Sequence, residues 1–313
     1  MKKFISKIFI FLIPVALYLI VVAIMDPYDF FSNSTVISSV AKENVSFKLN
    51  YPLFKLLKFE HAPKKSIVLG DSRSKDLNPN LIDGCSKTEY SNLAYGGGTL
   101  QEAILTFWEV SKTEGLTKVA IGINFDLYNA SNNNDRVSEA IGLKNNFTSY
   151  GSSRYVFKSM AIILKNKILN KPYTIGVPEM TTQEFWDYQL NSAANNVYRI
   201  YKYPDNYFSE LKKIKQYCQK NSIELLFFIP PTHIELQKKI QEFDLEAEQA
   251  RFKEDLKSLG SFYDFDFSNT LTNNKENFDD PYHCTDSISK IITETIFCKR
   301  VSTSFPNYFK YYE

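Results

Sequence analysis

Residues Ser66–Leu69, with the sequence SIVL, lead directly into Gly70–Ser74, with the sequence GDSRS. A short apolar run that ends at a glycine predicts a buried strand, and the turn-forming residues after it predict a tight loop. In open α/β sheets, ligands bind at the carboxyl ends of the strands. We therefore expect Ser72 on an exposed turn at this edge, near the N-terminus of a helix, where its own N–H could help to bind an oxyanion.

Similar apolar runs recur along the chain and alternate with stretches of helical periodicity. The stretch Thr99–Glu114 has apolar residues on one helical face, and Thr99 is suited to cap its first turn. Further strands are expected at residues 89–94, 118–123, 223–229 and 262–267, and further helices at residues 208–220, 234–243, 247–259 and 287–297. Strands that alternate with helices predict a three-layer, flavodoxin-like α/β fold with a central parallel sheet.

The alternation breaks between residues 127 and 206, where a polar run and clusters of Ser, Gly, Tyr and Asn occur. We interpret this segment as an insertion, partly helical over residues 155–169, that forms a lid or a wall of the substrate site. The other predicted divisions are a stub and membrane anchor at 1–25, a juxtamembrane connector at 26–63, a folded domain at 64–300 that contains the insertion, and an aromatic tail at 301–313 that docks on the domain.

The N-terminus has the pattern of a membrane anchor. Lys2, Lys3 and Lys7 precede an uncharged apolar run from Ile8 to Met25, and Asp26 ends it. Eighteen residues is at the lower edge of what spans a bilayer as a helix, about 20 residues. The run is longer than a usual signal-peptide core and lacks an Ala-x-Ala site, which favours an uncleaved anchor over a cleaved signal or a buried helix. Positive charge before the run predicts a cytoplasmic N-terminus, with the rest of the chain in the periplasm or at the cell surface.

The composition is that of an ordinary globular protein, with 44% hydrophobic and 23% charged residues. The net charge of +2 and the lack of a long basic block give no reason to expect nucleic acid. The 25 Phe and 20 Tyr residues predict a thick core, and aromatic platforms for sugar rings are the alternative.

The four cysteines, Cys85, Cys218, Cys284 and Cys298, lie far apart and form no Cys-x-x-Cys pair. We therefore do not expect a zinc site. Asp264 and Asp266 lie on one face of the last predicted strand, as in an ordinary amphipathic strand, so we do not expect them to hold another metal. In an exported protein the cysteines could pair as disulfides, and burial as free thiols is the alternative.

A second cluster of reactive residues lies between the last predicted strand and the closing helix, at Asp280-Pro281-Tyr282-His283. An aspartate three residues before a histidine can bend back and accept a hydrogen bond from Nδ1, which leaves Nε2 free to take a serine proton. Asp279 adjoins Asp280 and is the alternative partner. With Ser72, these residues predict a Ser-His-Asp triad.

Taken in chain order, these landmarks resemble the SGNH (GDSL-like) hydrolase family. Gly70-Asp71-Ser72 matches the Gly-Asp-Ser of its first block, and the pair Asp280 and His283 matches its last block, Asp-x-x-His. The resemblance covers roughly residues 66–297 and is weakest across the insertion. It implies that Ser72 is the nucleophile, His283 the base and Asp280 its charge partner.

The two inner blocks of the family also have counterparts. Asn92, followed by Gly97, matches the second block, and Gly122-Ile123-Asn124 matches the Gly-x-Asn-Asp of the third. The fourth position of the third block is Phe125, and Asp126 comes one residue later. The resemblance implies an oxyanion hole made by the N–H groups of Ser72 and Gly97 and the side chain of Asn124.

An anchor followed by such a domain resembles the envelope-facing branch of the family. That branch includes the accessory protein of teichoic-acid D-alanylation and the alginate acetylation proteins, which work with a membrane-bound O-acyltransferase on surface polymers. The resemblance implies a cofactor-free esterase or O-acyltransferase that acts on acylated polysaccharide. A noncatalytic glycan-binding or scaffold protein of the same fold is the main alternative. A nucleotide binder is disfavoured, because no Gly-x-Gly-x-x-Gly follows the first strand.

Three more residues near the expected active edge could contact substrate. Arg73 and Ser74 flank the nucleophile and could bind an anionic or hydroxylated group, or could cap the following turn. His233 follows the strand at 223–229 and could shape the pocket, although a local hydrogen bond in a turn is its simpler role.

Overall fold

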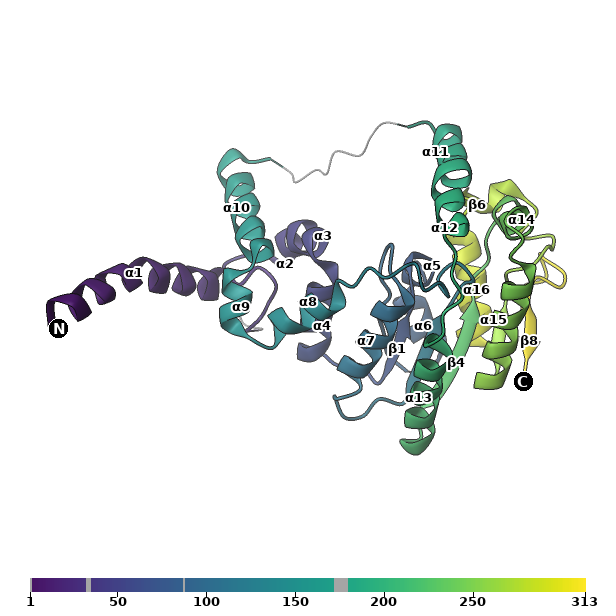
Figure 1. Ribbon diagram of the computed structural model, residues 1–313, viewed down its shortest axis with the longest axis horizontal. Helices are drawn as coiled ribbons and strands as arrows, with labels where there is room; N and C mark the ends of the chain where they lie inside the picture. The colour runs from purple at the N-terminus through teal and green to yellow at the C-terminus, as the bar shows by residue number, and fades with distance from the viewer. Residues whose placement is uncertain (1, 32–34, 87, 172–179) are drawn as a thin grey trace. The chain divides into compact units, whose positions relative to one another are not determined.

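The computed structural model describes residues 2–31, 35–86, 88–171 and 180–313, without the side chains of residues 2–11 and 86. The chain divides into two compact units (Figure 1). The sheet unit consists of Pro63–Asp135 and Pro178–Glu313, and the helical unit consists of Met1–Ala62 and Arg136–Val177.

The sheet unit is built on six strands in the order β2-β1-β3-β4-β5-β8. The first five strands of that order are parallel, and β8 pairs with β5 in the antiparallel sense. This arrangement confirms the prediction of an α/β fold with a central, mostly parallel sheet. The strands are β1 (Ser66–Leu69), β2 (Tyr90–Asn92), β3 (Lys118–Gly122), β4 (Glu224–Ile229), β5 (Phe262–Asp264) and β8 (Lys310–Tyr312).

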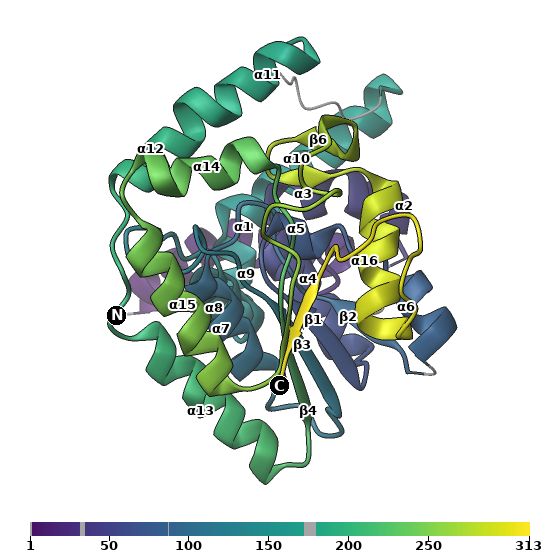
Figure 2. The ribbon, with the colours of Figure 1, turned by 90° about the vertical axis from the view of Figure 1, so that its right-hand side faces the viewer.

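Helices cover both faces of this sheet (Figure 2). On one face lie α7 (Leu100–Val110), α13 (Tyr207–Lys220) and α15 (Glu246–Leu259). On the other face α6 (Pro79–Ser86) packs beside α16 (Asp286–Cys298). The shorter elements are α5 (Ser72–Lys75), α11 (Thr182–Tyr188), η2 (Gln189–Ala194), α12 (Asn195–Arg199), α14 (Ile234–Glu242), η3 (Lys275–Asn277), β6 (Phe278–Asp280) and β7 (His283–Cys284).

Local sequence explains where these elements begin. The hydroxyl of Thr99 accepts a hydrogen bond from the N–H of Glu102, and the Glu102 carboxylate accepts one from the N–H of Thr99. This reciprocal capping satisfies two backbone donors at the start of α7, where helical N–H groups have no partner within the helix. The expected cap at Thr99 is therefore present.

The aromatic C-terminal tail becomes the sixth strand of the sheet. β8 pairs along β5, and the ring of Tyr312 stacks on that of Phe262 with centroids 4.6 Å apart. The tail covers the edge of β5, which would otherwise expose unpaired backbone groups.

A disulfide bond joins Cys85 in α6 to Cys298 at the end of α16, with Cα atoms 5.3 Å apart. Cys218 and Cys284 are free thiols. Of the two alternatives for the cysteines, one pair therefore forms a disulfide, and the other two remain thiols.

The helical unit combines the N-terminal segment with part of the predicted insertion. Residues 136–171 of the insertion belong to this unit, whereas 127–135 and 180–206 belong to the sheet unit. Residues 172–179 lie outside the described residues. The predicted connector at 26–63 is largely helical, because its apolar side chains pack with those of residues 137–169, as in the contact of α4 with α8. The helices are α1 (Lys2–Met25), α2 (Ser39–Ala41), η1 (Lys42–Ser46), α3 (Phe47–Leu49), α4 (Tyr51–His61), α8 (Val137–Lys144), α9 (Phe147–Ser152) and α10 (Arg154–Leu169).

Helix α1 ends at a buried aspartate. The Asp26 carboxylate accepts hydrogen bonds from the N–H groups of Phe30 and Phe31 and from the hydroxyl of Tyr150. Among the parts of the chain that the structure describes, none of the helices is both long and apolar enough to cross a membrane. The side chains of residues 1–11, which include the start of the predicted anchor, lie outside that description.

Candidate active site

Ser72 lies at the carboxyl end of β1, as the first residue of α5. Gly70 makes the turn possible, with φ of +139°, and a Cβ at this position would lie 2.8 Å from the backbone oxygen of Gly122. Only glycine adopts such a conformation without strain. Asp71 then caps α5 by accepting a hydrogen bond from the N–H of Arg73 at 3.0 Å.

Asp280 and His283 lie on a hairpin formed by β6 and β7. Asp280 Oδ1 accepts hydrogen bonds from the backbone N–H groups of Tyr282 at 2.8 Å and His283 at 3.1 Å. Its other oxygen, Oδ2, lies 2.8 Å from His283 Nδ1. The hairpin thus fixes the carboxylate through its own backbone and leaves the second oxygen to orient the imidazole.

The hairpin brings the imidazole to the serine. His283 Nε2 lies 2.7 Å from Ser72 Oγ, although the two residues are 211 positions apart. Asp280, which contacts the imidazole, is buried, whereas the alternative Asp279 is exposed. A carboxylate that holds the Nδ1–H tautomer leaves Nε2 free to accept the serine proton, which is the arrangement of a serine nucleophile with its base.

The two other residues predicted for the oxyanion hole follow β2 and β3, the strands on either side of β1. Gly97 lies in the loop after β2, with φ of +56°. Asn124 is buried after β3, and its Nδ2 donates to the Pro230 carbonyl at 2.7 Å, which leaves one amide hydrogen for another acceptor. The Oδ1 of Asn124 has no hydrogen-bond partner among the described residues. Because the strands are parallel, both residues lie at the same edge of the sheet as Ser72.

Arg73, predicted to be able to contact substrate, is instead buried among charged groups. Its guanidinium donates to Asp126 Oδ1 and Oδ2, at 2.9 and 3.0 Å. Its Nε and Nη2 both donate to a single oxygen of Asp71, Oδ2. The Tyr282 ring covers it, with its centroid 5.7 Å from Cζ. Burial acts to lower the pKa of Arg73, but the charges of Asp126 and Asp71 outweigh it and raise that pKa.

This ion-pair network gives a physical reason why Phe125 occupies the last position of the third block and the aspartate, Asp126, follows one residue later. Phe125 is buried and stacks on Tyr201, with ring centroids 4.5 Å apart. The next residue, Asp126, then reaches Arg73 and ties the turn after β3 to the turn after β1. The sequence contained the signal, since the arginine beside the nucleophile needs a carboxylate once it is buried, but spacing alone could not pair residues 53 positions apart.

Ser74 and His233 are also buried. Ser74 lies against Gly70 and Gly122, where a Cβ on either glycine would come within 2.4 Å of its hydroxyl oxygen. His233 caps α14, its Nδ1 accepts from the N–H of Glu235, and burial lowers its pKa. In this structure both residues support the site and neither is open to a substrate.

Asn92 has a role that the sequence did not reveal. Its amide group donates to the carbonyls of Ser74, Lys75 and Leu77 at the end of α5, and its oxygen accepts from the N–H of Ala94. This side chain therefore closes the short helix that begins with Ser72.

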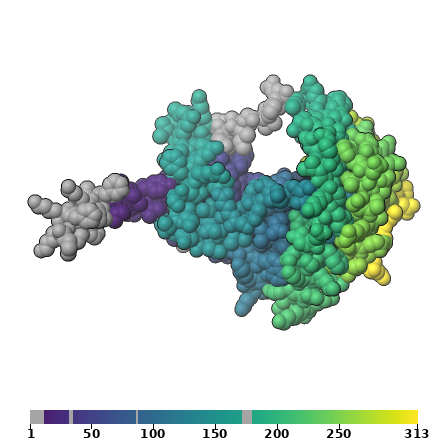
Figure 3. Space-filling model, in the orientation of Figure 1, coloured from purple at the N-terminus to yellow at the C-terminus, as the bar shows by residue number. Residues whose placement is uncertain are grey.

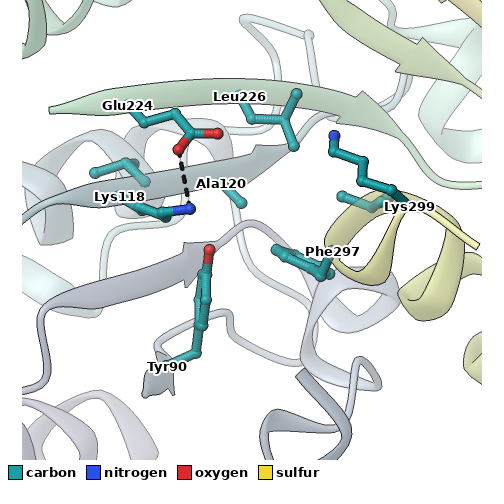
Figure 4. Close-up of a pocket in the computed structure, with 9 residues that line it drawn as sticks. Tyr90, Lys118, Ala120, Glu224, Leu226, Phe297 and Lys299 are labelled. Atoms are coloured by element: carbon teal, nitrogen blue, oxygen red, sulfur yellow. Dashed lines mark ion pairs between the residues drawn. The ribbon is translucent and has the colours of Figure 1, made fainter. Parts of the chain in front are cut away.

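A separate hollow lies at the opposite end of the strands (Figure 4). It is lined by the first residues of three strands, Tyr90, Lys118 and Glu224, together with Lys299, and Lys118 is ion-paired with Glu224 at 3.0 Å. Because Ser72 follows the carboxyl end of β1, this hollow is not part of the candidate active site.

No family model matches the sequence, and no curated protein matches it. Among solved structures, one from Streptococcus pneumonia that is provisionally assigned as a platelet activating factor is 10% identical, with a TM-score of 0.41 over 80% of this chain and 94% of that chain. A provisionally assigned lipolytic protein of the G-D-S-L family from Desulfitobacterium hafniense DCB-2 is 15% identical, with a TM-score of 0.36 over 74% of this chain and 96% of that chain. Both likenesses are distant, so the interpretation of the site rests on its geometry.

Proposed function

We propose that this chain is a membrane-anchored, extracytoplasmic serine hydrolase of the SGNH type, an esterase or O-acyltransferase that acts on acyl esters of cell-envelope polysaccharide. The observation that carries the proposal is the hydrogen-bonded series from Ser72 Oγ to His283 Nε2, at 2.7 Å, and from His283 Nδ1 to Asp280 Oδ2, at 2.8 Å. A serine hydroxyl is a weak nucleophile unless an oriented base takes its proton.

In the proposed reaction, Ser72 Oγ attacks the ester carbonyl carbon while its proton passes to His283 Nε2. Asp280 stabilises the imidazolium and stays ionised. The N–H groups of Ser72 and Gly97 and the second amide hydrogen of Asn124 would donate to the oxyanion. One such donor typically contributes about a hundredfold or more to the rate. His283 then returns the proton to the leaving alcohol, and an acyl-serine remains.

The acyl-serine could pass its acyl group to water or to a sugar hydroxyl, and the outcome depends on whether the acceptor site excludes water. The polysaccharide substrate and a membrane-bound O-acyltransferase as partner follow from the resemblance of the anchored chain to envelope acylation proteins. Both are part of the proposal, and their supports are the motifs of the sequence rather than a bound ligand.

Two features support a place outside the cytoplasm. The bond between Cys85 and Cys298 is of a kind that persists in oxidising compartments. Along α1, exposed apolar side chains run from Leu12 to Ile24, which is unusual for a helix surrounded by water. Together with the basic residues before the apolar run, they support an anchor with a cytoplasmic N-terminus.

The test is intact-mass labelling of the detergent-solubilised full chain with a fluorophosphonate, which reacts with activated serines. One adduct is expected on the parent protein and on Ser74→Ala, and none on Ser72→Ala. Ser74→Ala is the matched control, because it removes a buried hydroxyl two residues away that has no hydrogen-bond partner among the described residues.

A folded parent protein that gains no adduct would refute the independent-hydrolase proposal. The preferred alternative would then be a noncatalytic glycan-binding or scaffold protein. Where an adduct forms, a chromogenic acetate ester supplies the acyl group in the presence of an added polyol. The ratio of acetylated polyol to free acetate among the products then separates transfer from hydrolysis.

A further inference from the structure

Helix α10 of the helical unit has two apolar faces. One face packs into the unit through Val156, Met160 and Ile163, which are buried. The other face carries large apolar side chains that remain exposed, namely Phe157, Leu164 and Ile168, at 61%, 44% and 80%. These three positions are seven and four residues apart, so they form one stripe along the helix.

The exposed stripe is bordered by positive charge. Lys158 and Lys165 are exposed beside it, and Lys167 lies in the last turn. The sequence of α10 contains no Asp or Glu. A helix with an exposed apolar stripe and basic flanks is typical of segments that bind membrane surfaces.

Contacts within the helical unit connect α10 to the C-terminal half of α1. The Tyr18 hydroxyl donates to the Gly151 carbonyl at 2.8 Å, so α9 lies against the last turns of α1. Gly151 permits this close approach, because a Cβ there would lie 2.7 Å from a methyl carbon of Leu19. Helix α10 begins two residues after α9, and its Ser159 donates to the Tyr28 hydroxyl just beyond α1. In Figure 1, α10 runs across the direction of α1.

We propose that α10 is an interfacial helix that lies on an anionic lipid surface, with Phe157, Leu164 and Ile168 at the acyl boundary and Lys158 and Lys165 on lipid phosphates. This inference rests on the proposed anchoring by α1. If α1 crosses the bilayer, a helix that runs across it lies parallel to the membrane plane.

The depth of the contact between α1 and α9 agrees with this placement. Tyr18 precedes Asp26, the first charged residue after the apolar run, by eight residues, which is roughly 12 Å along a helix. Interfacial helices bury their apolar face to about 5–10 Å, the level of the last turns of α1. At this depth, lipid acyl chains would cover the exposed apolar stripe of α10, and lipid phosphates would lie beside the lysines that border it.

The inference can be tested on the full chain with nitroxide labels at single positions. Ile168→Cys reports the stripe, Val15→Cys reports α1, and Glu254→Cys reports an exposed position on the sheet unit. Each is made with Cys284→Ser, since Cys218 is buried and the other cysteines are bonded. After reconstitution into phosphatidylcholine vesicles with and without phosphatidylglycerol, collision with oxygen and with a water-soluble nickel chelate measures the depth of each label.

We expect the Ile168 label to be shielded from nickel relative to the Glu254 label, and more so with phosphatidylglycerol. A shielded Val15 label with an Ile168 label as nickel-accessible as that at Glu254 would overturn the inference and leave the anchor intact. A nickel-accessible Val15 label would refute the anchor and the inference that rests on it. The catalytic proposal is independent of both results.

Charge reversal tests the anionic partner. Each lysine near an anionic surface contributes about fivefold to the binding equilibrium constant. Lys158→Glu with Lys165→Glu should therefore lower the ratio of shielded to accessible Ile168 label by on the order of twentyfold. The matched control is Lys212→Glu with Lys220→Glu, the same change on exposed positions of α13, and should leave the label unchanged. Equal shielding in all three proteins would overturn the role of lipid phosphates.

Discussion

Replacement of Arg73 by methionine tests the buried charge network beside the nucleophile. The side chains of Arg73, Asp71 and Asp126 are 4%, 8% and 15% exposed, so two carboxylates would lose their counter-charge within the protein. Removal of one partner from a buried ion pair typically costs about 3–5 kcal/mol. Because Asp126 keeps some contact with water, we expect Arg73→Met to cost about 3 kcal/mol of unfolding free energy.

Urea unfolding followed by tryptophan fluorescence measures this cost in the relevant unit. Both tryptophans of the chain, Trp108 and Trp186, lie in the sheet unit. Lys257→Met is the control, because the Lys257–Glu254 pair is 39% and 67% exposed and should contribute under about 1 kcal/mol.

A double variant separates the charge effect from lost packing. Adding Asp126→Asn to Arg73→Met removes one of the stranded charges, so the double variant should be more stable than Arg73→Met alone. If Arg73→Met costs no more than Lys257→Met, or if the second substitution adds its full cost, the buried-network reasoning is refuted.

Three further variants test the catalytic series, the packing under the turn and a buried carboxyl. Asp280→Asn should lower kcat of ester hydrolysis by about 10³–10⁴, because the amide favours the wrong tautomer of His283, and an unchanged pH-independent kcat would contradict this. Gly122→Ala would place a Cβ 2.0 Å from Ser74 Oγ, so we expect a lower urea midpoint together with slower fluorophosphonate labelling. Burial raises the pKa of Asp266 to about 6 from an ordinary value near 3.8, so between these values the native state holds a proton that the unfolded chain releases. The free energy of unfolding should therefore fall by about 2 kcal/mol as the pH rises from 4 to 6, and Asp266→Asn should flatten this dependence in urea midpoints measured at the two pH values.

The parts of the fold that depend on local patterns could be predicted from the sequence. The strand expected at residues 66–69 has the bounds of β1, because four apolar or small residues stop at a glycine that the turn requires. The helix expected after Thr99 begins where that residue caps it. The approach of Asp280 to His283 also follows from local spacing, since the hairpin needs only four residues to bring them together.

Features that depend on distant contacts could not be predicted in this way. The disulfide joins residues 213 positions apart, and four cysteines without a spacing pattern allow several pairings. The union of residues 1–62 with 136–177 depends on how amphipathic helices pack, which helical periodicity does not specify. Periodicity likewise gave no sign that α10 has a second, exposed apolar stripe.

The base and the nucleophile of the proposed triad are positioned by different contacts, so a substitution can affect one more than the other, and chemical labelling can measure this. Asp280 is oriented by the backbone of its own hairpin, so the orientation of the His283 imidazole is set within that hairpin. The hairpin meets the turn after β1 where the Tyr282 ring covers Arg73. Ser72 depends on a turn that Arg73 ties to Asp126 in the loop after β3. Loss of Arg73 should therefore displace the nucleophile more than its base. In Arg73→Met, the rate of fluorophosphonate labelling, which reports Ser72, should fall by a larger factor than the rate at which diethyl pyrocarbonate modifies His283. In Asp280→Asn, both rates should change.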